Sequence, residues 1–394
     1  MAHQIESNVV ETVVQLLSES GLSQMAEAIR IMLNEAMRIE RSKSLAAEPY
    51  EHTEQRRGYA NGFKPKTVDT RLGKITFEVP QTRGVEFYPS ALEKGVRSER
   101  ALKLAIAEMY VQGVSTRNVT QVMQQLCGFD VSSSQVSRAA QMLDDELNAW
   151  RQRSIGEMPY LLLDARYEKV RHGGSVVSCA ILMAVGVNSG GRRTLLGVSV
   201  SLSEAEVHWR DFLASLQDRG LHGTKLIISD NHAGLNAARQ ARFPSVPWQR
   251  CQFHLQQNAS HYVPRIEMRT AVISDLRSIF NAPDRLEADR RLEIVIRKYE
   301  KSAPKLALWL EANVPDGLTV FAFPAAHWRR LRTSNVLERL NREIKRRTRV
   351  ATLFPNEASL LRLVSAILME ISEEWDTQIV YITMENSGSS CMQE

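Results

Sequence analysis

Residues 160–201, which read YLLLDARYEKVRHGGSVVSCAILMAVGVNSGGRRTLLGVSVS, decide the fold of the centre of the chain. Glycine-containing turns divide this segment into three runs rich in β-branched and other apolar residues, a pattern that predicts consecutive strands. The expected elements are three strands, a helix, a strand, a helix and a last strand, at Tyr160–Val170, Ser175–Val187, Arg193–Ser201, Glu204–Asp218, Leu226–Ser229, Leu235–Ala241 and Trp248–Phe253. This order predicts an α/β core with mixed strand directions.

Helical patterns flank this core on both sides, so we expect a multi-domain α+β protein. A small β-rich element with strands at Thr67–Leu72 and Lys74–Val79 precedes it, and helices at Pro264–Phe280, Pro283–Lys301 and Pro304–Asn313 follow it. The expected regions are an N-terminal helical region (1–55), the β-rich element (56–97), a helix-turn-helix-like domain (98–150), the first part of the core (151–260), a helical insertion (261–324), the final helices of the core (325–385) and a disordered tail (386–394).

Composition excludes several classes of protein. The chain has 394 residues, of which 43% are hydrophobic and 24% charged, so it can bury a core and is neither collagen-like nor intrinsically disordered. We find no apolar run long enough to span a membrane and no secretory signal. The four cysteines are scattered without paired spacing, which is typical of a reducing compartment. We therefore expect a cytoplasmic protein without a membrane partner.

Positive charge is concentrated in one segment. The whole chain carries a net +5, but Ala325–Val350 has nine basic and two acidic residues, a net +7, which leaves −2 for the rest. A solvated helix face is the usual explanation of a charge run, but so few acids among so many bases favour a polyanion such as nucleic acid.

Two aspartates occupy strands that should be buried. Asp164 interrupts the first expected strand, and Asp230 ends the fourth. These strands should be neighbours in a sheet of this order, so both carboxylates can converge on one site, where a divalent cation would relieve their repulsion. A salt bridge is the alternative for each, and Asp230 could instead cap the helix that follows it.

A third acid, Glu338, lies within the basic segment, at the head of the basic ridge of its helix. The run Asn335–Glu338 fits a capping box, with Glu338 reaching back to the Asn335 backbone. Helical spacing also places Glu338 on one face with Asn341, Arg342, Lys345 and Arg349. A carboxylate at the head of a basic ridge suits metal-assisted chemistry on a bound phosphodiester.

The segment Ser115–Leu143 has the proportions of a helix-turn-helix, with Gly128 in the turn and a second helix from about Ser132 to Trp150. Its second helix would then present Ser133, Gln135 and Arg138 to the major groove. An ordinary helical hairpin is the alternative. The motif Cys251-x-x-His254 lacks the second pair that a zinc site normally needs.

The chain resembles the Mutator-type transposases of bacterial insertion sequences, a branch of the DDE transposases. The resemblance extends from about Arg56 to Ile382. Its motifs are LLLDARYEKVR (161–171), VGVNSGGR (185–192), IISDNHAG (227–234), WQRCQFH (248–254) and FPAAHWRRLRTSNVLERLNREIKRRTRVATLFPNE (323–357).

This resemblance implies a ribonuclease H-like core interrupted by a helical insertion. Its catalytic and metal-binding acids would be Asp164, Asp230 and Glu338, with two Mg²⁺ ions (Mn²⁺ being an alternative), and Cys251 and His254 would lie beside them. The expected activity is cleavage and strand transfer at the terminal inverted repeats, with double-stranded DNA and a second copy of the chain as partners. A catalytically silent DNA-binding regulator and a simple nuclease are the alternatives. The residues expected to contact DNA are Ser133, Gln135, Arg138, Arg332, Arg339, Asn341, Arg342, Lys345, Arg346, Arg347 and Arg349.

Overall fold

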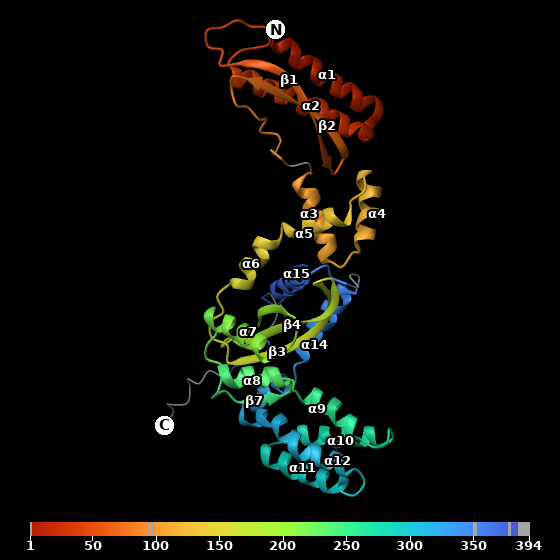
Figure 1. The fold of residues 1–394 in the computed structure, drawn as a ribbon, viewed down its shortest axis with the longest axis vertical. Coiled ribbons are helices and arrows are strands. Elements are labelled where there is room, and N and C mark those ends of the chain that lie inside the picture. The colour runs from red at the N-terminus through yellow and green to blue at the C-terminus, as the bar shows by residue number, and fades with distance from the viewer. Residues whose placement is uncertain (1, 93, 96–97, 350–352, 377–379, 385–394) are drawn as a thin grey trace, which may run out of the picture. The chain divides into compact units, whose positions relative to one another are not determined.

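A computed structural model describes residues 2–92, 94–95, 98–349, 353–376 and 380–384 (Figure 1). The chain divides into two compact units, Met1–Leu143 and Asp144–Glu394. The tail expected at 386–394 lies outside the described residues. Within the described part, no helix is both long and apolar enough to cross a membrane.

The first unit begins with two helices that pack against a β-hairpin. Its elements are α1 (Ala2–Ser20), α2 (Met25–Leu45), β1 (Tyr59–Thr70), β2 (Gly73–Arg83), α3 (Arg100–Val111), α4 (Thr116–Cys127) and α5 (Ser133–Gln141). The two strands are antiparallel and longer than the sequence predicts. Every second residue of β2 from Ile75 to Val79 is buried, and Ile75 and Phe77 pack with Met37 of α2, as the period of a half-buried strand requires.

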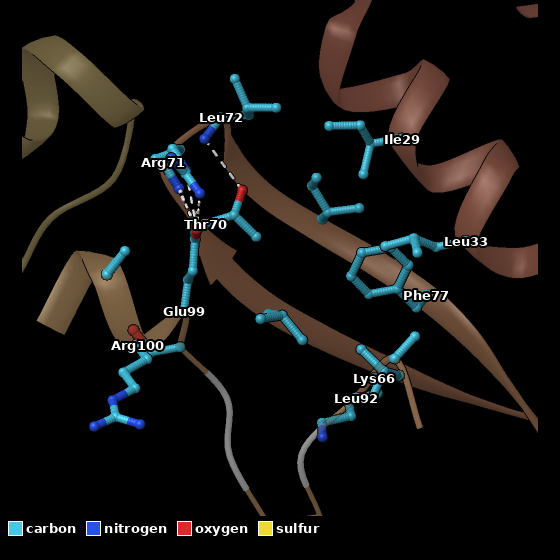
Figure 2. Close-up of a pocket in the computed structure, with 15 residues that line it drawn as sticks. Ile29, Leu33, Lys66, Thr70, Arg71, Leu72, Phe77, Leu92, Glu99 and Arg100 are labelled. Carbon is cyan, nitrogen blue, oxygen red and sulfur yellow. Dashed lines mark hydrogen bonds and ion pairs between the residues drawn. The ribbon is translucent and has the colours of Figure 1, made fainter. Parts of the chain in front are cut away.

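A pocket of about 510 Å³ lies between α2 and the hairpin (Figure 2). Its apolar lining includes Ile29, Leu33 and Phe77. At its edge the side chains of Arg71 and Glu99 point toward each other and form an ion pair with an N···O distance of 2.7 Å. This pair fixes the hairpin turn to the start of α3.

A turn joins α4 to α5, and the helix ends on both sides of it are capped. The Ser115 hydroxyl caps α4, and Gly128, with φ of 70°, ends it in the left-handed conformation that favours glycine. Ser132 and Gln135 form a complete capping box at α5. The helix expected to run to Trp150 is wrong as a single element, because α5 ends at Gln141 and α6 (Asp144–Gln152) begins a separate helix in the second unit.

The second unit contains a five-stranded sheet in the order β5-β4-β3-β6-β7. The strands are β3 (Tyr160–His172), β4 (Ser175–Val187), β5 (Arg193–Ser201), β6 (Leu226–Ser229) and β7 (Trp248–Arg250). The first three are antiparallel, whereas β6 runs parallel to β3, and β7 parallel to β6. The sequence therefore predicted the strands and the neighbouring positions of β3 and β6 correctly. Only β7 is shorter than expected, because Cys251 is already the N-cap of the next helix.

Helices cover both faces of this sheet. On one face, α7 (Glu206–Asp218) and α8 (Ala233–Arg242) pack on Leu161 and Leu163 of β3. On the other face, α14 (Asn335–Thr348) and α15 (Glu357–Asp376) lie against β3. Because side chains alternate along a strand, Asp164 and Glu168 face α14, and both form hydrogen bonds to it.

The helical insertion has a core of its own. Its helices are α9 (Gln252–Ala259), α10 (Met268–Phe280), α11 (Arg285–Tyr299) and α12 (Pro304–Asn313), with α13 (Ala325–Leu331) leading back to the sheet. Leu255, Leu276 and Leu310 are among its buried residues. Proline opens α12 as expected, but α10 and α11 begin after their prolines, and the Asp284 carboxylate caps α11 instead. The side chain of Gln249 in β7 bonds to Gly317 and Val320 and thereby ties the insertion to the sheet.

Candidate active site

The register of the sheet brings Asp164 and Asp230 to the same level of two adjacent strands. Leu162 of β3 pairs with Ile228 of the parallel strand β6. Two residues further along, Asp164 of β3 and Asp230, which directly follows β6, lie at corresponding levels, and the charge of Asp230 acts on Asp164. Neighbouring strands lie about 4.8 Å apart, so the two carboxyl groups share one environment. Asp230 does not cap α8: its carboxylate accepts a hydrogen bond from the Asn231 amide, and His232 occupies the cap position.

Helix α14 faces this pair of acids along one stripe of its surface. Ser334, immediately before the helix, donates through its backbone amide and its hydroxyl to the Cys251 sulfur, at 3.4 and 3.3 Å. Two turns later Asn341 donates from Nδ2 to Asp164 Oδ2 at 2.8 Å. Glu338 lies between these contacts at helical spacing, so it occupies the same stripe.

The capping box predicted for Glu338 is wrong. Ser334 rather than Asn335 occupies the N-cap, and no side chain completes a capping bond there. The half-buried Glu338 keeps one carboxyl oxygen, Oε1, buried without a hydrogen-bond partner. A buried carboxylate oxygen without a partner is costly, and the stripe directs it to the region of the other two acids.

Cys251 and His254 lie on the first turn of α9, beside the acids. Burial alone would raise the pKa of the Cys251 thiol, but His254 and Ser334 lower it overall. Burial alone would likewise lower the pKa of His254, but Cys251, Asp230 and Asp164 raise it to about 9. The imidazole therefore places a positive charge beside the two aspartates at neutral pH.

The environment of Asp164 opposes its ionisation. Burial is the largest cause, and with the nearby Asp230 it raises the pKa of Asp164 to about 6, against the lowering effects of His254 and Asn341. Strongly raised carboxyl pKa values are typical of functional sites.

The carboxylates of Asp164, Asp230 and Glu338 do not form a compact cluster. Among the described residues, no group of three His, Cys, Asp or Glu side chains stands close enough to hold a metal ion. The donors nevertheless suit a hard divalent cation in kind: two neighbouring carboxylates, and a third with a buried oxygen that lacks a partner.

The basic ridge of α14 is smaller than the sequence predicts. Arg339, Arg342, Lys345 and Arg349 are exposed. Arg346 is exposed but pairs with Glu343, and Arg332 is half-buried and donates to Asn281.

Two residues assigned to the ridge do not lie on it. Asn341 bonds to Asp164 in the site. Arg347, whose side chain is 6% exposed, forms ion pairs with Glu343 and with Glu370 of α15. Its buried guanidinium joins α14 to α15, and the charge count could not include this pairing because Glu370 lies outside the window that was counted.

The other predicted DNA contacts belong to the first unit. Ser133 and Arg138 are exposed on α5, whereas the side-chain Oε1 of Gln135 accepts a hydrogen bond from the Ser132 backbone amide in the capping box. Sequence reasoning missed Ser334, which anchors the start of α14. In the sequence, Ser334 is marked only by its position four residues before Glu338. This spacing indicates a role for Ser334 only when its contact with Cys251 is known.

Comparisons with known proteins find relatives along nearly the whole chain. The sequence model of the family described as "Transposase, Mutator family" matches residues 3–378. The transposase for insertion sequence element IS406 of Burkholderia multivorans is 59% identical over 97% of this chain and 99% of its own length. The ISRM5 transposase of Rhizobium meliloti is 41% identical (97% and 96%), and the IS256 transposase in Tn4001 of Staphylococcus aureus is 33% identical (94% and 95%). The chain belongs to the Mutator family of transposases.

Proposed function

We propose that this chain is a DDE-type transposase that cleaves DNA at the terminal inverted repeats of an insertion sequence and joins the freed ends to a target. The observation that carries the proposal is the convergence of Asp164 and Asp230 on adjacent parallel strands, with Glu338 facing them from α14. The sheet order and the helices on both faces support a ribonuclease H-like core.

Asp164, Asp230 and Glu338 would hold two Mg²⁺ ions, or Mn²⁺ in their place. When bound, these ions supply activation of a hydroxyl nucleophile and stabilisation of the leaving oxygen. The donor chemistry fits, since all three residues offer carboxylate oxygens and the Glu338 oxygen lacks a partner.

The surrounding residues position these acids and the DNA. Asn341 fixes the orientation of the Asp164 carboxylate through its hydrogen bond. His254, with a pKa of about 9, offsets the mutual repulsion of Asp164 and Asp230. Arg339, Arg342 and Lys345, exposed on the same helix, would bind phosphates beside the acids.

The turn between α4 and α5 supports a helix-turn-helix that reads the terminal repeats. Its exposed Ser133 and Arg138 stand at the beginning of α5, where residues of a recognition helix contact base edges. The backbone of this turn is held by two capped helix ends, so α5 has a defined orientation to α4.

The test uses DNA from the two ends of the element and the variants Asp164→Asn, Asp230→Asn and Glu338→Gln. We expect each to lose Mg²⁺-dependent nicking and joining by at least about 100-fold while DNA binding survives, since removal of one transition-state stabilising group costs that much. Asp211→Asn, an exposed acid on α7, is the matched control and should keep full activity.

Each possible outcome discriminates between functions. Unimpaired joining by Glu338→Gln would remove Glu338 from the site. Cleavage by the wild type without any joining would indicate a simple nuclease, and binding without either reaction would indicate a silent regulator.

A further inference from the structure

One end of the hairpin β1–β2 packs on α2, and the other end is exposed. Near its turn, β2 packs on α2 through Ile75 and Phe77. At the other end, every residue of β1 from Tyr59 to Pro65 is exposed, and within the described ranges this stretch pairs with β2 alone. A two-stranded ribbon of this kind is narrow enough to enter the major groove of DNA, which is about 12 Å wide.

This hairpin carries a second concentration of positive charge. Residues 56–83 contain seven basic and two acidic residues, a net +5 in a short segment. Arg57, Lys64 and Arg83 are exposed and form no ion pair with a carboxylate among the residues that the structure describes. Three arginines of α11 are by contrast neutralised locally, because Arg285, Arg290 and Arg297 each pair with an acid three or four residues away. The three pairs are with Asp289, Glu287 and Glu293.

Cations and aromatic rings alternate at the open end. Tyr59 is 64% exposed and lies directly opposite Arg83 in the strand register. The Arg56 guanidinium lies 5.4 Å from the centre of the Tyr59 ring. These residues line a hollow of about 970 Å³ together with Arg57 and Asn61.

A bulge shapes the same end of the hairpin. The register shifts between Ala60 and Phe63, and Gly62 has a φ of 72° there. Bulges bend a strand and increase its twist. The exposed Phe63 lies beneath the guanidinium groups of Arg38 and Arg41 of α2, at 5.1 and 5.0 Å, and because Arg41 is buried and Arg38 pairs with Glu35, these contacts hold the ring on α2.

We propose that the open end of this hairpin, formed by residues 56–64 and Arg83, is a binding surface for the phosphate backbone of duplex DNA, separate from the ridge of α14. Unpaired cations on an exposed ribbon complement a polyanion, and each phosphate neutralised releases condensed counterions. B-form DNA suits a ribbon better than RNA does, because the major groove of an RNA helix is deep and narrow. The inference deepens the proposed function and rests on it for the nature of the partner.

The test measures DNA binding by the full-length chain between 50 and 200 mM KCl, with fluorescence anisotropy of a terminal-repeat duplex and of an unrelated duplex of equal length. The variant is Arg57→Gln/Lys64→Gln/Arg83→Gln. Because each phosphate contact contributes about 0.9 to the slope of log affinity against log salt, the slope should become flatter by about 2.7 for both duplexes. The wild type would then lose roughly 40-fold more affinity than the variant over this range of salt.

The matched control is Arg285→Gln/Arg290→Gln/Arg297→Gln, which removes the same charge from locally paired residues of α11. Its salt slope should equal that of the wild type, and the thermal midpoints of all three proteins should agree within a few degrees. This control separates loss of a binding surface from loss of overall charge.

An unchanged slope in the hairpin variant, with wild-type binding intact, would overturn the inference and leave the proposed function standing. Loss confined to the terminal-repeat duplex would also overturn it, in favour of base reading. A change in self-association by light scattering without a change in slope would identify the hairpin as an interface between copies of the chain instead. If the wild type bound neither duplex, the proposed function itself would fail.

Discussion

The Asp164 carboxyl lies in an environment that favours its protonated form. Its pKa is raised to about 6 from a usual value of 3.8, chiefly by burial. An acid whose folded pKa is raised stabilises the fold below the unfolded pKa and loses that contribution as pH rises through the folded value. The free energy of unfolding in EDTA should therefore fall between about pH 4 and pH 6 because of this residue.

The substitution Asp164→Asn should remove this pH dependence and stabilise the metal-free protein. This pKa shift is equivalent to about 3 kcal/mol in the free energy of unfolding. Because the Asp164 side chain is partly exposed, we expect a gain of about 2 kcal/mol at pH 7.5. Thermal unfolding in EDTA should show a higher midpoint for the variant at pH 7.5 and none of this gain at pH 4. A lower midpoint at pH 7.5 would contradict the predicted environment of Asp164.

Cys251 anchors the start of α14 through its sulfur. The side chain is fully buried and accepts two hydrogen bonds from Ser334. Cys251→Ala should leave those donors unsatisfied and lower the stability by about 2 kcal/mol. Cys251→Ser retains an acceptor and should lose less. Thermal midpoints together with DNA cleavage measure both effects, and equal behaviour of the two variants would argue against the anchor.

At the scale of single elements, α14 combines a structural face and an exposed face. The Arg347 guanidinium contacts Glu370 through two hydrogen bonds of 2.6 and 2.8 Å and a further one to Glu343 of 2.7 Å. Lys345, two residues earlier, is exposed. The two cations are close in sequence, yet the turn of the helix gives them different roles.

Replacing each of these cations by alanine should separate the roles. Arg347→Ala removes the ion pairs of a buried guanidinium with Glu343 and Glu370 and should cost about 2 kcal/mol of stability, since hydrogen bonds between charged groups are lost. Lys345→Ala should leave the thermal midpoint unchanged and make the salt dependence of DNA binding flatter by about 0.9. A stable Arg347→Ala variant with weakened DNA binding would restore Arg347 to the ridge.

Element types were predictable where the local pattern is strong. The strands β4, β5 and β6 and the helix α12 have the bounds that the sequence predicts, because apolar runs ended by glycine or opened by proline leave few alternatives. The helix expected from Ser132 to Trp150 failed, because its period continues through Leu143 while the chain turns there. The prediction of a capping box at Glu338 was wrong, because Ser334 occupies the N-cap and donates its hydroxyl to Cys251, which is far away in sequence.

At the scale of the whole molecule, the boundary between the compact units lies at Leu143 and Asp144. Helix α6 belongs to the second unit: Asp144 pairs with Arg362, and Arg151 donates to Ser365. A fragment of residues 144–394 should therefore fold cooperatively, whereas one beginning at Tyr160 should melt at a lower temperature because it lacks these contacts.

The same two fragments test which unit recognises the terminal repeats. Residues 144–394 should bind DNA without preference for the terminal repeats, since α4, α5 and the hairpin, which we propose as DNA contacts, lie in the first unit. Specific footprinting of a terminal repeat by this fragment would assign end recognition to the second unit. Circular dichroism melting and footprinting provide the two measurements.

Local periodicity and short motifs were enough to predict the order of strands and helices in the core and the family, and they give Asp164, Asp230 and Glu338 as the candidate acids. The strand order also placed Asp164 beside Asp230, since parallel neighbours align their residues by register.

Only the tertiary structure decided what the remaining polar residues do. Asn341 orients Asp164, Arg347 joins two helices, and Ser334 reaches Cys251, each through a partner at least 23 residues away. Such contacts depend on how helices pack on a sheet, which a one-dimensional charge count cannot contain. The basic segment that suggested a polyanion therefore separates into an exposed ridge and a set of internal ion pairs and hydrogen bonds.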